Sequence, residues 1–177
     1  AMERACFFQH QSLAEFQDTV ALHIAAINMA LDGIPADQVR LHCCWGNRDG
    51  PHTEDVALDD VLTLLLEAKV GGLCLPFANP RHAHEIELLR TTPLPPEMVL
   101  VTGTIESTSN YVEHPEVVAE RIVRAAEALG DRERVIAGVD CGFGTFAGYS
   151  LVADDVVWAK LQALSDGAAL ASKRLWS

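Results

Sequence analysis

Four short apolar segments, each followed by a helical pattern after a polar loop, constrain the fold of this chain more than any other feature. The segments lie at residues 39–45, 72–78, 98–105 and 134–140. Segments that are apolar on both faces and alternate with helices are typical of parallel strands whose sheet is covered by helices. The sequence therefore predicts an α/β fold built from consecutive strand–helix units.

Apolar residues at three- and four-residue spacing predict five helices. They lie at residues 11–31, 58–69, 81–90, 115–129 and 154–176. Ser12 is the expected N-cap of the first, and Pro115 opens the fourth. About four parallel strands and five helices thus form one domain over residues 1–177, with two unpaired sheet edges unless something covers them. Either the chain forms a small open sheet, or two half-barrels associate.

The charge of the chain excludes some classes of partner. The 25 acidic residues outnumber 13 basic ones, for a formal net charge of −12, so no cationic surface is expected for nucleic acid or an anionic membrane. No apolar run approaches the roughly 20 residues that span a bilayer, and the N-terminus lacks the order of a signal peptide. We therefore expect a cytoplasmic protein whose five cysteines are thiols rather than disulfides.

Histidine and cysteine residues gather where two predicted strands end. His42 and Cys44 are two residues apart in the first strand and so share one face, while Cys43 points to the other; Cys141 follows the last strand. An imidazole and two thiolates can hold Zn²⁺ tetrahedrally and leave a fourth position for substrate. The alternative is that the two cysteines are small buried side chains and His42 is a core histidine.

Five segments resemble the cobalamin-independent methionine synthase family, within the uroporphyrinogen decarboxylase superfamily. The resemblance covers nearly the whole chain and implies the C-terminal half of a TIM-type (β/α)₈ barrel, with the four strands being its fifth to eighth. The matching segments are HCCWGN, FANPRHAHE, VEHPEVVAERIVRAAEALG, VIAGVDCGFGTFAG and VVWAKLQALSDGAALASKRLW.

The family resemblance implies a zinc-dependent methyltransferase. Its zinc ion would be held by His42, Cys44 and Cys141 and would bind the thiol of homocysteine or a similar acceptor, with a methyltetrahydrofolate-like donor. Where the family has a glutamate ligand this chain has Pro76, which leaves three donors or a substitute such as Cys74. The histidine that the family places after the third strand as a proton donor is also missing, and no residue is assigned a catalytic role.

The remaining expectations concern substrate and partners. Arg81 and His82 begin a helix after the second strand, where they could bind a substrate carboxylate or anchor the loop. Two copies of the chain, or a separate N-terminal half, would complete the barrel. The alternative functions are another enzyme of the superfamily, or a truncated or decayed paralogue that keeps the fold and perhaps a metal. Pro76 is the residue that most favours decay.

Overall fold

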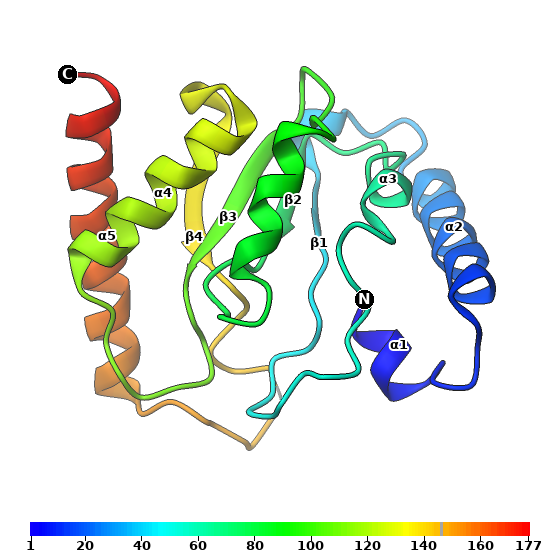
Figure 1. Cartoon of the computed structure of the whole chain (residues 1–177), viewed down its shortest axis with the longest axis horizontal. Helices are drawn as coiled ribbons and strands as arrows, with labels where there is room; N and C mark the ends of the chain where they lie inside the picture. Colours follow the sequence, from blue (N-terminus) through cyan, green and yellow to red (C-terminus); the bar gives the residue numbers. More distant parts are fainter. Residues whose placement is uncertain (146) are drawn as a thin grey trace.

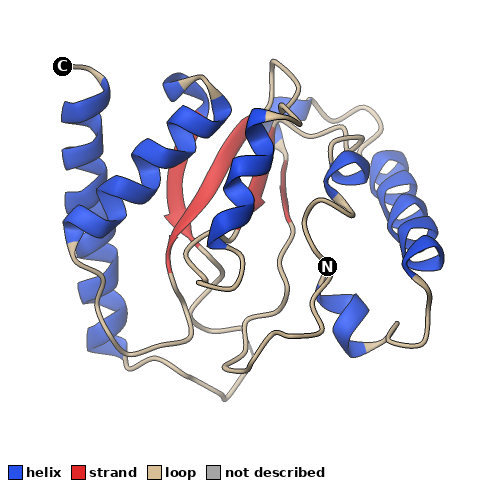
Figure 2. Ribbon diagram, viewed as in Figure 1, coloured by secondary structure: helices blue, strands red, loops and turns tan. Residues whose placement is uncertain are grey.

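The fold is a single parallel sheet flanked by helices (Figures 1 and 2). A computed structural model describes residues 1–145 and 147–177; Phe146, within the resembling segment VIAGVDCGFGTFAG, lies outside the described residues. The strands are ordered β1-β2-β3-β4, and every neighbouring pair is parallel. This confirms the predicted α/β half-barrel of four strands. Their bounds are β1 Arg40–His42, β2 Gly72–Leu75, β3 Val99–Ile105 and β4 Val135–Val139.

Three of the five predicted helices form at nearly the expected residues. Helix α2 is opened by a complete capping box between Ser12 and Glu15, and α4 has Pro115 in its first turn and a left-handed Gly130 (φ 74°) after its last. The helices are α1 Met2–Cys6, α2 Leu13–Ala30, α3 Leu62–Leu65, α4 Pro115–Leu129 and α5 Asp154–Leu175, with 3₁₀ turns η1 Ala36–Gln38, η2 Ala83–Arg90 and η3 Arg132–Arg134.

Two predicted helices differ from the structure. Of residues 58–69 only α3 is α-helical, and tighter turns flank it, such as the bond from the Ala68 amide to the Leu65 carbonyl. Residues 83–90 form the 3₁₀ helix η2 instead of an α-helix. Both segments bury their apolar side chains, so packing is satisfied without regular α-helical bonds. Helix α1 lies outside the predicted elements.

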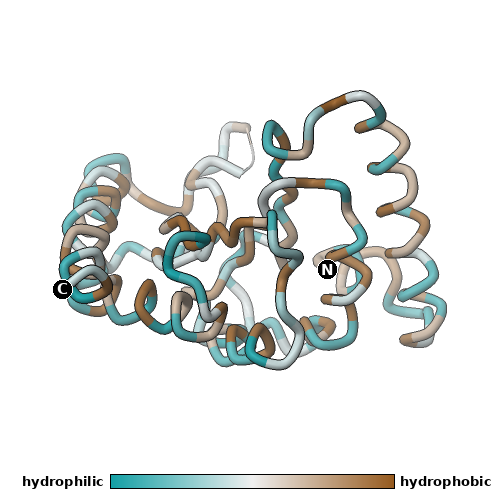
Figure 3. Tube along the Cα trace, turned by 90° about the horizontal axis from the view of Figure 1, so that it is seen from above, coloured by the Kyte–Doolittle hydropathy of each residue, from teal (hydrophilic) through white to brown (hydrophobic). Residues whose placement is uncertain are grey.

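The two faces of the sheet have different environments. Leu73, Leu75 and Leu100 are almost completely buried beneath the helical layer, in which η2 and α4 lie in front of the sheet and α2 and α5 lie at its two ends (Figure 2). The opposite face carries Cys74 and Ile136, and Ile136 is 37% exposed. Seen from above, hydrophobic segments run through the centre of the molecule (Figure 3). The partly exposed face corresponds to the interior of a barrel.

Both edges of the sheet are unpaired within the described chain. Strand β1 pairs only with β2, and β4 pairs only with β3. Unpaired edges leave backbone N–H and C=O groups without ladder partners. Among the described residues, no helix is long and apolar enough to span a membrane.

Candidate metal centre

His42, Cys44 and Cys141 come together although they lie at opposite edges of the sheet. His42 is the last residue of β1, Cys44 lies two residues after it, and Cys141 lies two residues after the end of β4. The ligand atoms of the three side chains all lie within 4.8 Å of one another. The curvature of the sheet thus places the carboxyl ends of β1 and β4 close together, as at the mouth of a barrel.

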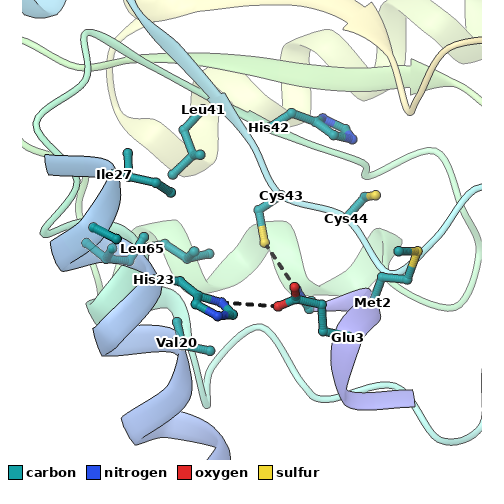
Figure 4. Close-up of a pocket in the computed structure, with 13 residues that line it drawn as sticks. Met2, Glu3, Val20, His23, Ile27, Leu41, His42, Cys43, Cys44 and Leu65 are labelled. Carbon is teal, nitrogen blue, oxygen red and sulfur yellow. Dashed lines mark hydrogen bonds and ion pairs between the residues drawn. The ribbon is translucent and has the colours of Figure 1, made fainter. Parts of the chain in front are cut away.

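Alternation along β1 separates the two neighbouring cysteines. Cys43 is buried and faces an apolar pocket whose walls include Val20 and Leu65 (Figure 4). The side chains of His42 and Cys44 point away from that of Cys43, although both residues also border this pocket (Figure 4). Burial raises the pKa of the Cys43 thiol, which is therefore a packing group rather than a donor.

The spacing between the His42 and Cys141 donors fits a tetrahedral zinc ion. With Zn–S near 2.3 Å and Zn–N near 2.1 Å, a tetrahedral angle separates sulfur from nitrogen by about 3.6 Å. The Sγ of Cys141 lies 3.6 Å from the Nε2 of His42. One imidazole and two thiols are also the donor types that zinc prefers. The residues present therefore fit the metal that the family resemblance implies.

The two thiols of this group share their protons unequally. A hydrogen bond from the Cys141 thiol, opposed by burial and assisted by His42, lowers the pKa of Cys44 to about 4. The same hydrogen bond and burial raise the pKa of Cys141 far above its usual range. The two thiols thus compete for a proton, and a metal ion, which needs deprotonated thiols, would displace it.

The position of the expected fourth ligand lies beside this group. Pro76 lines the same narrow cavity as Cys44 and Cys141, but its side chain offers no donor atom. Cys74 pairs in register with His42 across the β1–β2 ladder, yet its sulfur does not belong to the group of three donors. Burial raises the pKa of Cys74, so it remains a protonated thiol.

Two buried carboxylates that the sequence analysis did not single out line the same cavity. Glu106 follows β3, and Asp140 follows β4. Asp140 accepts hydrogen bonds from the amides of Ala78 (2.8 Å) and Asn79 (2.7 Å), while burial raises its pKa to about 7. A side chain on Gly103 would overlap the Asp140 carboxylate. The position of both acids directly after a strand was the available sequence signal.

Asn47 is a further residue that sequence reasoning missed. It is buried, its Nδ2 donates to the Gly142 carbonyl (2.6 Å), and its Oδ1 accepts from the Ser107 hydroxyl (2.8 Å). These contacts join the loops that follow β1, β3 and β4. Asn47 therefore holds together the three strand ends that build the candidate centre.

His82 belongs to a separate buried network. Its Nδ1 contacts Glu85 (2.8 Å), its Nε2 contacts Asp55 (2.9 Å), and its ring stacks on Trp45 at 3.7 Å. Asp55 also bonds His52 at 2.6 Å. Two carboxylates on the two ring nitrogens require both nitrogens to donate, which is the imidazolium form.

This network fastens the long loop after β1 to the start of η2. His52, Asp55 and His82 could in principle hold a metal, but their ligand atoms bond directly to one another. Arg81 is exposed, and neither Arg81 nor His82 lies in the group of three donors. The predicted substrate-binding role of Arg81 and His82 remains a prediction.

Comparison with known proteins gives distant relatives. No protein-family model matches the chain. It is 26% identical over 169 residues to the 2-hydroxypropyl-CoM lyase of Xanthobacter autotrophicus (strain ATCC BAA-1158 / Py2), covering 81% of this chain and 43% of the relative. It is 27% identical over 148 residues to the uncharacterized protein YxjH of Bacillus subtilis (strain 168), covering 82% of this chain and 38% of that protein.

A solved structure has a similar fold. It is a B12-independent methionine synthase from Shewanella sp. W3-18-1 in complex with selenomethionine, with a TM-score of 0.68 and 21% identity. The match covers 86% of this chain and 43% of the synthase chain, so the present chain spans less than half of each of these three proteins. In fold, the chain corresponds to one half of a barrel of the B12-independent methionine synthase type.

Proposed function

We propose that this chain carries the thiol-activating half of a zinc-dependent methyltransferase of the methionine synthase type. The observation that carries the proposal is the convergence of His42, Cys44 and Cys141 at distances suited to tetrahedral zinc. The reaction would move a methyl group from a methyltetrahydrofolate-like donor to the sulfur of homocysteine or a similar thiol.

The proposed chemistry needs a thiolate, because a free thiol with a pKa near 8.5 is mostly protonated at neutral pH. A zinc ion bound here would lower the pKa of a substrate thiol and hold its sulfur for attack on the methyl carbon. His42, Cys44 and Cys141 would hold the ion, and Asn47 would keep their three loops in place. The sulfur would form the new S–C bond, and the donor nitrogen would keep the electron pair of the broken N–C bond.

A second candidate function is a lyase or transferase acting on another sulfur compound. One relative is named as a 2-hydroxypropyl-CoM lyase, so related chains use a different sulfur substrate. The donor set described above would serve either reaction. A third possibility, a paralogue without catalysis, is favoured by Pro76, which leaves the donor set one ligand short.

A partner would complete the barrel in every version of the proposal. The unpaired edges of β1 and β4 and the partly exposed face with Ile136 require strands and side chains from another half. We propose a homodimer, with a separately encoded N-terminal half as the alternative. We also propose a cytoplasmic location, because a reducing compartment keeps Cys44 and Cys141 available to a metal.

The test is the metal content of the chain together with its response to thiols. We expect about one zinc ion per chain after purification without chelators, measured by elemental analysis. With Co²⁺ in place of zinc, homocysteine should change the visible absorption spectrum, while coenzyme M should do so if the second candidate is right. A metal-containing chain that responds to neither thiol would support the paralogue without catalysis. Absence of zinc, with no uptake at micromolar metal, would overturn both enzymatic candidates and leave the paralogue without catalysis.

A further inference from the structure

The candidate centre has three donors and a neighbouring carboxylate without a full set of partners. Glu106 is 8% exposed and lines the same cavity as Cys44, Cys141 and Pro76. Its Oε1 accepts from the Thr108 amide (2.7 Å) and from the Thr108 hydroxyl. Its Oε2 is buried and has no hydrogen-bond partner. A buried carboxylate oxygen without a donor is costly, so its presence beside a candidate cation site points to a ligand.

The nearest hydroxyl does not satisfy this oxygen. The Ser109 hydroxyl lies near the Glu106 carboxylate. Even so, neither the Ser109 Oγ nor the Glu106 Oε2 makes a hydrogen bond of normal geometry. The oxygen is therefore buried and without a partner, although it is not one of the three ligand atoms that lie within 4.8 Å of one another.

The backbone of Glu106 is fixed by a buried ion pair on the outer side of β3. Its amide donates to the Glu113 Oε1 (2.9 Å), and its carbonyl accepts from the Lys160 Nζ (3.0 Å). Lys160 is completely buried and pairs with Glu113 at 2.9 Å. Breaking a buried charged pair is strongly destabilising, so such a pair holds the groups that it bonds in place. Here it positions the residue that follows β3.

We propose that Glu106 supplies the fourth protein donor to the metal held by His42, Cys44 and Cys141. Its Oε2 would replace the carboxylate that Pro76 cannot provide, so the complete donor set is drawn from β1, β3 and β4 instead of including β2. This inference rests on the proposed zinc site. It also explains how the chain can carry proline at position 76 and still offer a fourth donor, which a substrate thiol would have to displace.

The experiment is a competitive chelator titration of zinc with the full chain and four variants, one of which is Pro76→Glu alone. Glu106→Gln should lower zinc affinity by at least 10- to 100-fold, because it replaces a charged donor with a neutral amide. Glu87→Gln is the matched control: it makes the same exchange at a carboxylate that lies outside this cavity and pairs with Arg90 and Arg124. Its effect should be several-fold smaller. Adding Pro76→Glu to Glu106→Gln should restore affinity, since it returns a carboxylate to the cavity.

A spectroscopic readout separates ligation from a general effect of charge. With Co²⁺, the native chain should give the intense visible bands of a four-coordinate site, and Glu106→Gln should alter them while Glu87→Gln does not. If Glu106→Gln fails to fold, Glu106→Asp, which retains the charge but shortens the side chain, should show the same spectral change with a smaller loss of affinity.

The outcomes distinguish this inference from the function on which it rests. If the native chain binds no metal, the proposed zinc site fails. If the native chain binds zinc but Glu106→Gln leaves both affinity and Co²⁺ spectrum unchanged, only the role of Glu106 is overturned. A large gain in affinity from Pro76→Glu alone would also overturn it, because that gain would show an unfilled fourth position in the native chain.

Discussion

Single residues at the end of β1 have opposite roles because the strand alternates its side chains. Cys141→Ser should remove most zinc binding, since a hydroxyl is a poor replacement for a thiolate ligand. Cys43→Ser should leave zinc binding unchanged, because Cys43 faces the apolar pocket beside Val20 and Leu65 (Figure 4). Zinc affinity measured against a coloured chelator compares the two variants.

The same two variants should also differ in stability, and here Cys43→Ser should have the larger effect. Cys43→Ser places a hydroxyl in a largely apolar pocket, although the N-terminal amine of Ala1, 3.8 Å from the Cys43 sulfur, can bond it; the expected cost is about 1 kcal/mol in the free energy of unfolding. Cys141→Ser changes a half-buried loop position and should cost less for the metal-free chain.

Equal zinc affinity in the two variants would contradict the assignment of Cys141 as a ligand.

At this scale, part of the candidate site was predictable from the sequence. The alternation of a strand was enough to place His42 and Cys44 on one side and Cys43 on the other, as Figure 4 shows. The isolated oxygen of Glu106 was not predictable, because it depends on which hydroxyls reach it and on the ion pair that fixes its backbone. Asn47 was missed for the same reason, since its partners are about 60 and 95 residues away.

At the scale of elements, the contact between α4 and α5 depends on the absence of a side chain. A Cβ on Gly167 would lie 2.5 Å from the Val118 side chain and 2.9 Å from the Pro115 carbonyl oxygen. Gly167→Ala should therefore destabilise the chain by roughly 1 to 3 kcal/mol through overpacking, although alanine favours a helix by about 1 kcal/mol. Urea unfolding measures the change.

Ala169→Gly, at an exposed position of the same helix, measures the intrinsic difference between the two residues. It should cost about 1 kcal/mol. A gain in stability from Gly167→Ala of similar size would mean that α4 and α5 are not in close contact at this point.

The His82 network should make stability depend on pH. Burial lowers the pKa of His82, but its bonds to Glu85 and Asp55 outweigh this and raise the pKa above the usual value. The stabilisation that protonated His82 gives the folded chain is complete below about pH 6.5, the pKa of histidine in an unfolded chain. It is lost as pH rises through the higher pKa of His82 in the folded chain. The free energy of unfolding should therefore fall between pH 6.5 and the mildly alkaline range.

His82→Gln should reduce this pH dependence and lower stability at pH 6, because Asp55 and Glu85 lose a charged partner. His23→Gln is the control, since His23 is 44% exposed and pairs only with Glu3 at the surface. Urea unfolding at several pH values compares the three chains. An unchanged pH profile in His82→Gln would show that another group dominates.

The elements themselves were predicted unevenly. The bounds of α4 could be predicted because proline at its start and glycine after its end are local signals. Residues 58–69 show the same apolar spacing, yet mostly form tight turns. Loop contacts decide their geometry: the Leu58 amide, for example, donates to the Glu85 carboxylate. Such contacts between distant segments are not visible in a local pattern.

For the whole molecule, the sheet is the strongest argument that the chain does not act alone. The face without a helical layer is only partly apolar, because the strand leucines face the helices instead. Arg40, His42, Cys74 and Val101 share that face with Ile136. Two unpaired edges nevertheless remain, and the matched synthase chain is more than twice as long as the segment it shares with this one.

A dimer with a two-fold axis would pair β1 of each copy with β4 of the other and close an eight-stranded ring. We expect sedimentation equilibrium at low micromolar concentration to give about 38 kDa, twice the 19.2 kDa of one chain. Ile136→Lys should shift the mass toward 19.2 kDa, because Ile136 would be enclosed inside the ring, where a lysine cannot be solvated. Val117→Lys is the matched control: Val117 is 40% exposed on α4, which lies between the two edges, so its mass should stay that of the native chain. A native mass of 19.2 kDa at all concentrations would rule out the homodimer and leave a separately encoded half as the partner to be sought.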